Sequence, residues 1–73
     1  MRLTTGERIR ALRKAHGLTQ EQLAEKCGVA SFKAVQNWEK DRAFPTTHSL
    51  IKLSQIFGVT VDEILKGGNN DIW

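Results

Sequence analysis

Four polar side chains with amide or ammonium groups recur at helical spacing near the middle of the chain. They are Lys33, Gln36, Asn37 and Lys40, and the steps of three and four residues between them place all four on one face of a helix. An asparagine or glutamine amide can bond the N6 and N7 of adenine in the major groove, and a lysine can donate to guanine O6 and N7. The face is therefore a candidate for contacts with base edges in double-stranded DNA. The plainer alternative is an ordinary solvent-exposed face.

Groups suited to catalysis or metal binding are sparse. The chain shows no nucleophile and base in an arrangement typical of an enzyme, and it has no glycine-rich phosphate loop, so we expect no enzyme activity. The single cysteine, Cys27, and the two histidines, His16 and His48, lie far apart in the sequence. We therefore expect no metal site and no cofactor. We interpret Cys27 as a small core residue and both histidines as surface residues.

The length and the charge distribution narrow the class of protein. A chain of 73 residues is one domain, and its formal net charge is +3. Residues 1–16 hold five basic residues and one acidic residue, whereas residues 41–73 hold three basic and four acidic ones. This asymmetry favours binding of a polyanion by the N-terminal part and of a protein partner by the C-terminal part. Because the chain lacks an apolar span and a signal-like start, and because one cysteine cannot form an internal disulfide, we expect a cytoplasmic protein.

Capping signals predict an all-α fold of five short helices. Hydroxyl residues followed three positions later by Glu or Gln form possible capping boxes at Thr4, Thr19 and Thr60. The fourth helix follows Pro45 and is capped by Thr46 or Thr47. The expected helices cover Thr5–His16, the segment between Thr19 and Gly28, Ser31–Lys40, the segment between Pro45 and Gly58, and a last one from Thr60 to about Gly67-Gly68. We take residues 1–68 as the domain and 69–73 as an unassigned tail.

The second and third expected helices fit a helix-turn-helix unit. Leu23 and Ala24 point inward, and the small Ala24 lets the following helix cross closely. Gly28 allows the positive φ angle that a sharp turn requires. This spacing is typical of a DNA-binding motif.

The chain resembles the phage-repressor and Cro-type helix-turn-helix family, often called XRE. The resemblance covers about residues 6–66 and rests on Gly6–Arg13, Leu18-Thr19-Gln20, Leu23-Ala24, Gly28-Val29, Trp38-Glu39, Pro45 and Phe57–Leu65. It implies a compact five-helix, lambda-repressor-like domain. It also implies a sequence-specific regulator of transcription, most often a repressor.

The turn departs from the family pattern by one residue. One extra residue lies between Gly28 and Val35, and we place it within Val29-Ala30-Ser31. This register keeps Val35 and Trp38 inward, whereas the rival register would bury the amide of Asn37 without a partner. The family's base-reading positions then fall on the following residues: Phe32, Lys33, Gln36 and Asn37. For Phe32 two roles remain open, contact with a thymine methyl or shielding of the longer turn.

The resemblance also implies contacts with the DNA backbone. The family places a glutamine against a phosphate at the start of the second helix, where free N–H groups favour an anion, and Gln20 matches it. Lys40 and Arg42 follow the third helix and are expected to reach the same backbone. Arg10 and Lys14 share a face of the first helix and are expected to make outer phosphate contacts, although plain solubility is an equal alternative.

Two further expectations concern structure and assembly. Family members pair an arginine of the first helix with the glutamate that follows the aromatic residue of the third helix, here Trp38. This implies a structural ion pair between Arg13 and Glu39. Members dimerise through their C-terminal helices, so residues 48–65 are the expected homodimer surface, with a palindromic operator. The alternatives are a longer regulator with its dimerising part elsewhere, or a protein-interaction or antitoxin-type module of the same fold.

Overall fold

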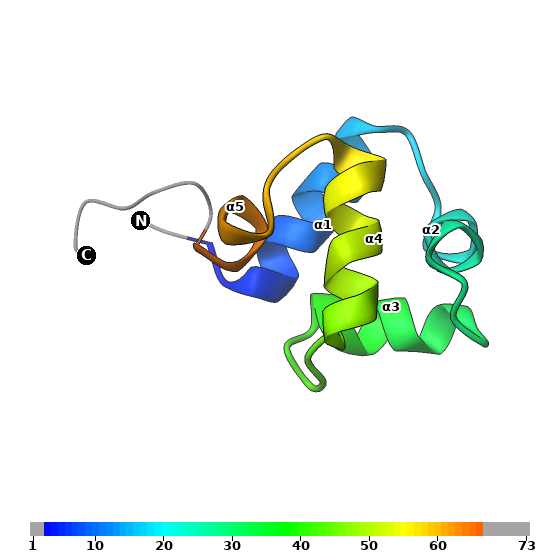
Figure 1. Ribbon diagram of the computed structural model, residues 1–73. Helices are drawn as coiled ribbons and strands as arrows, with labels where there is room; N and C mark the ends of the chain where they lie inside the picture. Colours follow the sequence, from blue (N-terminus) through cyan, green and yellow to red (C-terminus); the bar gives the residue numbers. More distant parts are fainter. Residues whose placement is uncertain (1–2, 67–73) are drawn as a thin grey trace.

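The computed structural model describes residues 3–66, and that part of the chain is entirely helical apart from its connections. Its helices are α1 (Thr5–Ala15), α2 (Gln20–Cys27), α3 (Phe32–Glu39), α4 (Thr47–Phe57) and α5 (Val61–Lys66). Figure 1 shows α3 along one edge of the domain with α4 crossing in front of it. The all-α, five-helix prediction is confirmed. The tail 69–73 and the predicted end of the last helix at Gly67-Gly68 lie outside the described residues.

Local capping explains where most helices begin. Thr4 and Thr19 each form the predicted capping box, in which the side chain of the cap accepts from the backbone N–H three residues on. The hydroxyl of Thr60 likewise accepts from the Glu63 N–H at 3.0 Å, and the Glu63 carboxylate accepts from the Thr60 N–H at 2.8 Å. Thr46, not Thr47, caps α4. These bonds satisfy N–H groups that a helix start leaves without partners.

Two helices differ slightly at their ends from the sequence prediction. The first helix ends at Ala15, and His16 is its C-cap rather than its last residue. The third helix is one residue shorter at each end, with Ser31 as N-cap and Lys40 as C-cap. Both differences follow from the half-helical backbone of capping residues.

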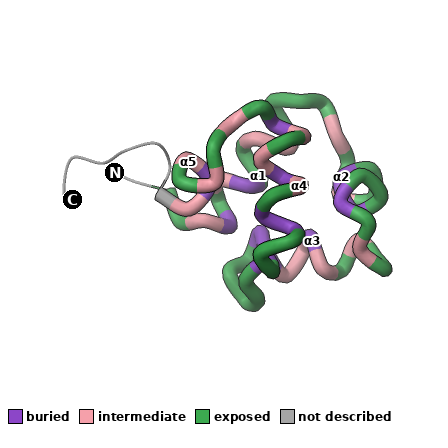
Figure 2. The backbone as a smooth tube through the Cα atoms, viewed as in Figure 1, coloured by how far each residue is buried: buried purple, intermediate pink, exposed green. Residues whose placement is uncertain are grey.

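The core lies where the five helices meet. Its buried residues are Ile9, Leu23, Ala24, Cys27, Val35, Trp38, Leu50, Leu53, Phe57 and Ile64. Figure 2 shows these buried positions on the inner sides of the helices. Ile56 is half-buried and packs at the margin of the core.

The packing of the helices presents α3 at the surface. It packs against α1 and α2, while α5 packs against α1 and α4, and α4 packs against α2. At the turn between α2 and α3, Gly28 adopts a φ of 73° as predicted. Within residues 3–66, no helix has the length and apolar character needed to cross a membrane.

Candidate nucleic-acid interface

Two of the four polar residues that the sequence placed on the outer face of α3 are exposed. Val35 is 0% exposed and Trp38 is 5% exposed, so the back of the helix is fixed in the core. Lys33 and Lys40 are exposed on the other side. The predicted burial of Val35 and Trp38 is therefore confirmed. Gln36 and Asn37, which the sequence also placed on this face, are half-buried.

Phe32 begins α3 and has one side in the core. It is half-buried and packs against the buried cluster. It also lines a surface hollow together with Val29 and Ala30 of the turn. This position supports the shielding role for the covered part of the ring, and the rest of the ring stays accessible.

A small hollow beside α3 brings several predicted contacts together. It measures about 200 Å³ and its wall consists of Arg10, Arg13, Gln20, Gln36, Glu39 and Lys40. Three predicted phosphate contacts, from three different helices or their caps, thus line the same hollow as one candidate base contact. Lys33, Asn37, Lys14 and Arg42 do not line this hollow. Lys14 is exposed on α1 and Arg42 is exposed in the loop after α3.

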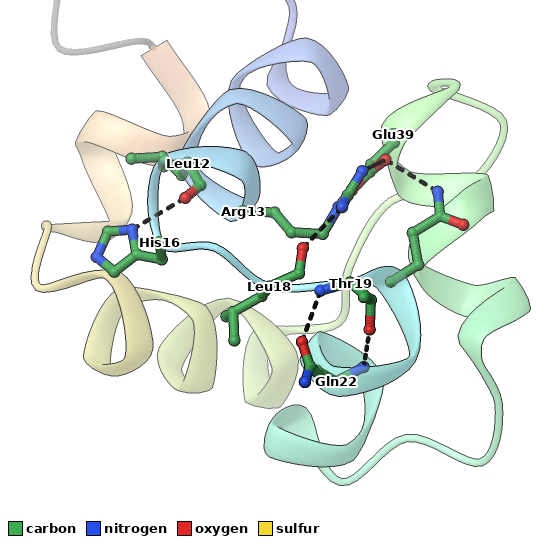
Figure 3. Close-up of polar contacts among 8 residues, drawn as sticks. Leu12, Arg13, His16, Leu18, Thr19, Gln22 and Glu39 are labelled. Atoms are coloured by element: carbon green, nitrogen blue, oxygen red, sulfur yellow. Dashed lines mark hydrogen bonds and ion pairs between the residues drawn. The ribbon is translucent and has the colours of Figure 1, made fainter.

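Two of the residues that line the hollow form an ion pair between α1 and α3. Arg13 Nε lies 2.6 Å from Glu39 Oε2, and Arg13 Nη2 lies 3.2 Å from Glu39 Oε1. Arg13 also donates from Nη1 to the Leu18 carbonyl at 2.8 Å, and Figure 3 shows its side chain reaching between Leu18 and Glu39. The two side chains are 11% and 4% exposed. The predicted pair is therefore present, and its burial suits a structural role.

Glu39 also holds Gln20 at the start of α2. The amide nitrogen of Gln20 donates to Glu39 Oε1 at 3.0 Å. A carboxylate only accepts hydrogen bonds, so it determines which end of the amide faces it. The second N–H of the same amide nitrogen stays available for another acceptor. One buried carboxylate thus joins α1, α2 and α3 below the candidate interface.

Asp41 forms a link that sequence reasoning missed. Its backbone has a φ of 58°, and no other non-glycine residue in the described part of the chain has a positive φ. Its carboxylate accepts from the Thr4 hydroxyl at 2.6 Å and from the Gly6 N–H at 2.9 Å. Asp tolerates this left-handed conformation better than most residues do, and an Asp directly after a helix is the local signal that could have revealed it.

Gly6 explains how closely α1 and α3 meet. A Cβ atom at this position would lie 2.2 Å from the Trp38 carbonyl oxygen and 2.7 Å from Asp41 Oδ1. No side chain therefore fits between the start of α1 and the end of α3.

Cys27 lies in the core, and both histidines lie at the surface, as the sequence predicts. Burial raises the pKa of the Cys27 thiol from 9.0 to about 11, although nearby Lys52 opposes the shift. This thiol is therefore protonated near neutral pH and a poor nucleophile. His48 is exposed, and His16, also exposed, lies with its ring centroid 5.2 Å from that of Phe57. Residues 3–66 hold no group of three or more potential metal ligands.

The sequence comparisons agree with this geometry. A helix-turn-helix family model matches residues 9–64. BcrR, a transcriptional activator of Enterococcus faecalis, is 44% identical over 61 residues, which are 84% of this chain and 29% of that protein. Repressor protein C2 of Salmonella phage P22 is 37% identical over 62 residues, which are 85% of this chain and 28% of the phage protein. The chain thus spans less than a third of these two relatives.

Solved structures are similar as well. The P22 c2 repressor in complex with a synthetic operator superposes with a TM-score of 0.84 at 37% identity, covering 89% of this chain and 97% of the other. The biofilm regulator SinR in complex with DNA gives a TM-score of 0.75 at 32% identity, covering 84% and 97%. With the family match over residues 9–64 and the buried back of α3, these similarities show that the chain belongs to the helix-turn-helix family of phage-repressor type.

Proposed function

We propose that this chain binds double-stranded DNA by inserting α3 into the major groove, and that it serves as the DNA-binding part of a transcriptional regulator. The observation that carries the proposal is the outer face of α3, held outward by the burial of Val35 and Trp38. The solved P22 c2 and SinR complexes with DNA support it, because both share this fold.

The base contacts in this proposal come from α3. Lys33 is exposed on the outer face, and Asn37 lies beside it at the next turn of the helix. Gln36 lines the hollow together with three of the expected backbone contacts. Their amide and ammonium groups suit purine edges in the major groove. The exposed part of Phe32 suits a thymine methyl group at the start of the helix.

The phosphate contacts surround the base contacts. Arg10, Gln20 and Lys40 share the hollow, and its ionised wall residues carry a net positive charge because Arg13 neutralises Glu39. Gln20 is also the first residue of α2, where free backbone N–H groups and the helix dipole favour an anion. Lys14 and Arg42 are exposed, and we propose them as further phosphate contacts.

The proposed assembly is a homodimer on a palindromic operator. One domain offers one recognition helix, and specific operators usually combine two half-sites about one helical turn apart. Residues 48–65 are the proposed contact, and Ile51 within them is 48% exposed although it is apolar. Sedimentation with and without operator DNA tests this step. If the protein were monomeric in both conditions, the dimer would be refuted but DNA binding by the single domain would not.

Selection of bound sequences from random DNA duplexes, followed by salt titration, tests the proposed function. We expect a preferred site, and an affinity that falls on a log–log plot with a slope near −0.9 per phosphate contact. Failure to enrich any sequence, together with an affinity that salt leaves unchanged, would refute the proposal and favour a protein partner.

A further inference from the structure

The Asp41 carboxylate is part of the polar cluster that starts α1. It accepts from the Thr4 hydroxyl at 2.6 Å and from the Gly6 N–H at 2.9 Å. Thr4 is the N-cap of this helix, and its hydroxyl also accepts from the Glu7 N–H at 3.1 Å. A residue that follows α3 thus supplies an acceptor for the first turn of a helix far away in the sequence.

These bonds tie the loop after α3 to another element. The backbone N–H groups of Lys40 and Arg42 bond back to carbonyls of α3 itself, at Gln36 and Asn37. Among the hydrogen bonds described for residues 3–66, the two made by the Asp41 side chain are the ones that join this loop to α1. The bonds to α3 alone leave the loop without a connection to α1. The two Asp41 bonds supply this connection and so fix the orientation of the loop relative to α1.

The charges around Asp41 make its orientation important. Asp41 stands in the sequence between Lys40 and Arg42, the two cations proposed to contact phosphates after α3. A carboxylate free to face DNA would repel phosphates there. Its bonds to Thr4 and Gly6 instead hold it against the positive end of the α1 dipole, where a negative charge is favourable.

The geometry points to Asp41 as a positioning residue for DNA binding, which holds Lys40 and Arg42 in place by fastening their loop to the start of α1. This inference rests on the proposed function, because it concerns how the proposed phosphate contacts are presented. It assigns no DNA contact to Asp41 itself. A role in capping α1 alone, or a role as a plain negative charge near DNA, makes different predictions.

Two substitutions separate these roles. Asp41→Gly keeps the left-handed backbone, since glycine adopts it freely, but removes the fastening side chain. Asp41→Asn removes the charge but retains an oxygen for the Gly6 N–H and an amide group for the Thr4 hydroxyl. We expect D41G to weaken binding about tenfold on both the selected site and random duplex, with a shallower salt dependence, and D41N to stay within about twofold of the wild type.

The other outcomes overturn the inference. If Asp41 acted only as a negative charge, both variants would bind more tightly than the wild type. If it only capped α1, both would bind with wild-type affinity per folded molecule, whatever their melting temperatures. A double substitution K40A/R42A supplies the matched background. There D41G should change affinity little, since the cations that it displaces are already absent, and a full tenfold loss would refute action through them.

A readout without DNA shows whether the fastening has been released. In amide-resolved NMR spectra, the Gly6 N–H should exchange faster with solvent in D41G than in the wild type or D41N, since its acceptor is gone. If D41G releases Gly6 and yet binds DNA as the wild type does, the inference about Asp41 fails while the proposed function stands. If the wild type shows neither sequence preference nor salt-dependent binding, the proposed function fails, and the Asp41 inference fails with it.

Discussion

Arg13 of α1 and Glu39 of α3 form a largely buried ion pair, with Nε and Oε2 2.6 Å apart. The side chains are 11% and 4% exposed, so water competes little for either charge. The same carboxylate accepts from the Gln20 amide at 3.0 Å, which brings α2 into the contact. The Glu39 carboxylate therefore links the three helices that present the candidate DNA surface.

Breaking this pair from one side should strongly destabilise the fold. We expect Arg13→Met to lower the free energy of unfolding by about 3–5 kcal/mol, because it leaves the Glu39 charge buried without its cation. The double variant R13M/E39M should lose less than the sum of the two single variants, since it leaves no unpaired charge. Urea unfolding of the four proteins measures the coupling. A loss below about 1 kcal/mol for R13M would mean that the pair behaves like an exposed one.

The close contact at Gly6 should tolerate no side chain. Gly6→Ala would place a Cβ atom 2.2 Å from the Trp38 carbonyl oxygen, so α1 and α3 must move apart, at a cost of about 1–3 kcal/mol or more. Gly17→Ala is the matched control, because an added Cβ at Gly17 would meet no atom within 4 Å. The φ of 68° at Gly17 is nevertheless unfavourable for alanine. Its cost is the backbone strain alone, about 1–2 kcal/mol. Thermal unfolding that ranks G17A as the more damaging change would contradict the close contact.

Base and phosphate contacts should respond differently to truncation. We expect Asn37→Ala or Gln36→Ala to cost about 1–3 kcal/mol of binding on the selected site and little on random duplex. Arg10→Ala should weaken both by a similar factor and reduce the salt slope by about 1. Fluorescence anisotropy titrations at several salt concentrations measure these differences. Equal losses on both duplexes for N37A would mean that Asn37 contacts the backbone rather than a base.

The Cys27 thiol should make stability depend on pH in the alkaline range. Burial raises its pKa from 9.0 to about 11, so the folded protein holds this proton more tightly than the unfolded chain does. The resulting stabilisation is fully present below about pH 9 and is lost as the pH rises towards 11. Unfolding free energies of the wild type and Cys27→Ala across this range isolate the effect. Parallel curves would refute it, and rapid alkylation of the native thiol at pH 8 would refute its burial.

The helix starts, the turn and the outward face of α3 were predictable from sequence because their causes are local. A hydroxyl at Thr19 meets an N–H three residues later within its own helix turn, whatever the rest of the chain does. The register of α3 follows from the spacing of Val35 and Trp38, which a helix places on one side. The choice of Thr46 over Thr47 as cap was beyond local reasoning, because both residues carry the same group one position apart.

The connections between helices were decided by tertiary structure. The bonds from Asp41 to Thr4 and Gly6 span more than thirty residues, and so does the contact that excludes a side chain from Gly6. The hydrogen bond from Gln20 to Glu39 likewise forms only because packing brings α2 and α3 together. Sequence spacing describes neighbours along one helix, whereas these contacts depend on the relative placement of several helices, which the burial of the whole core determines.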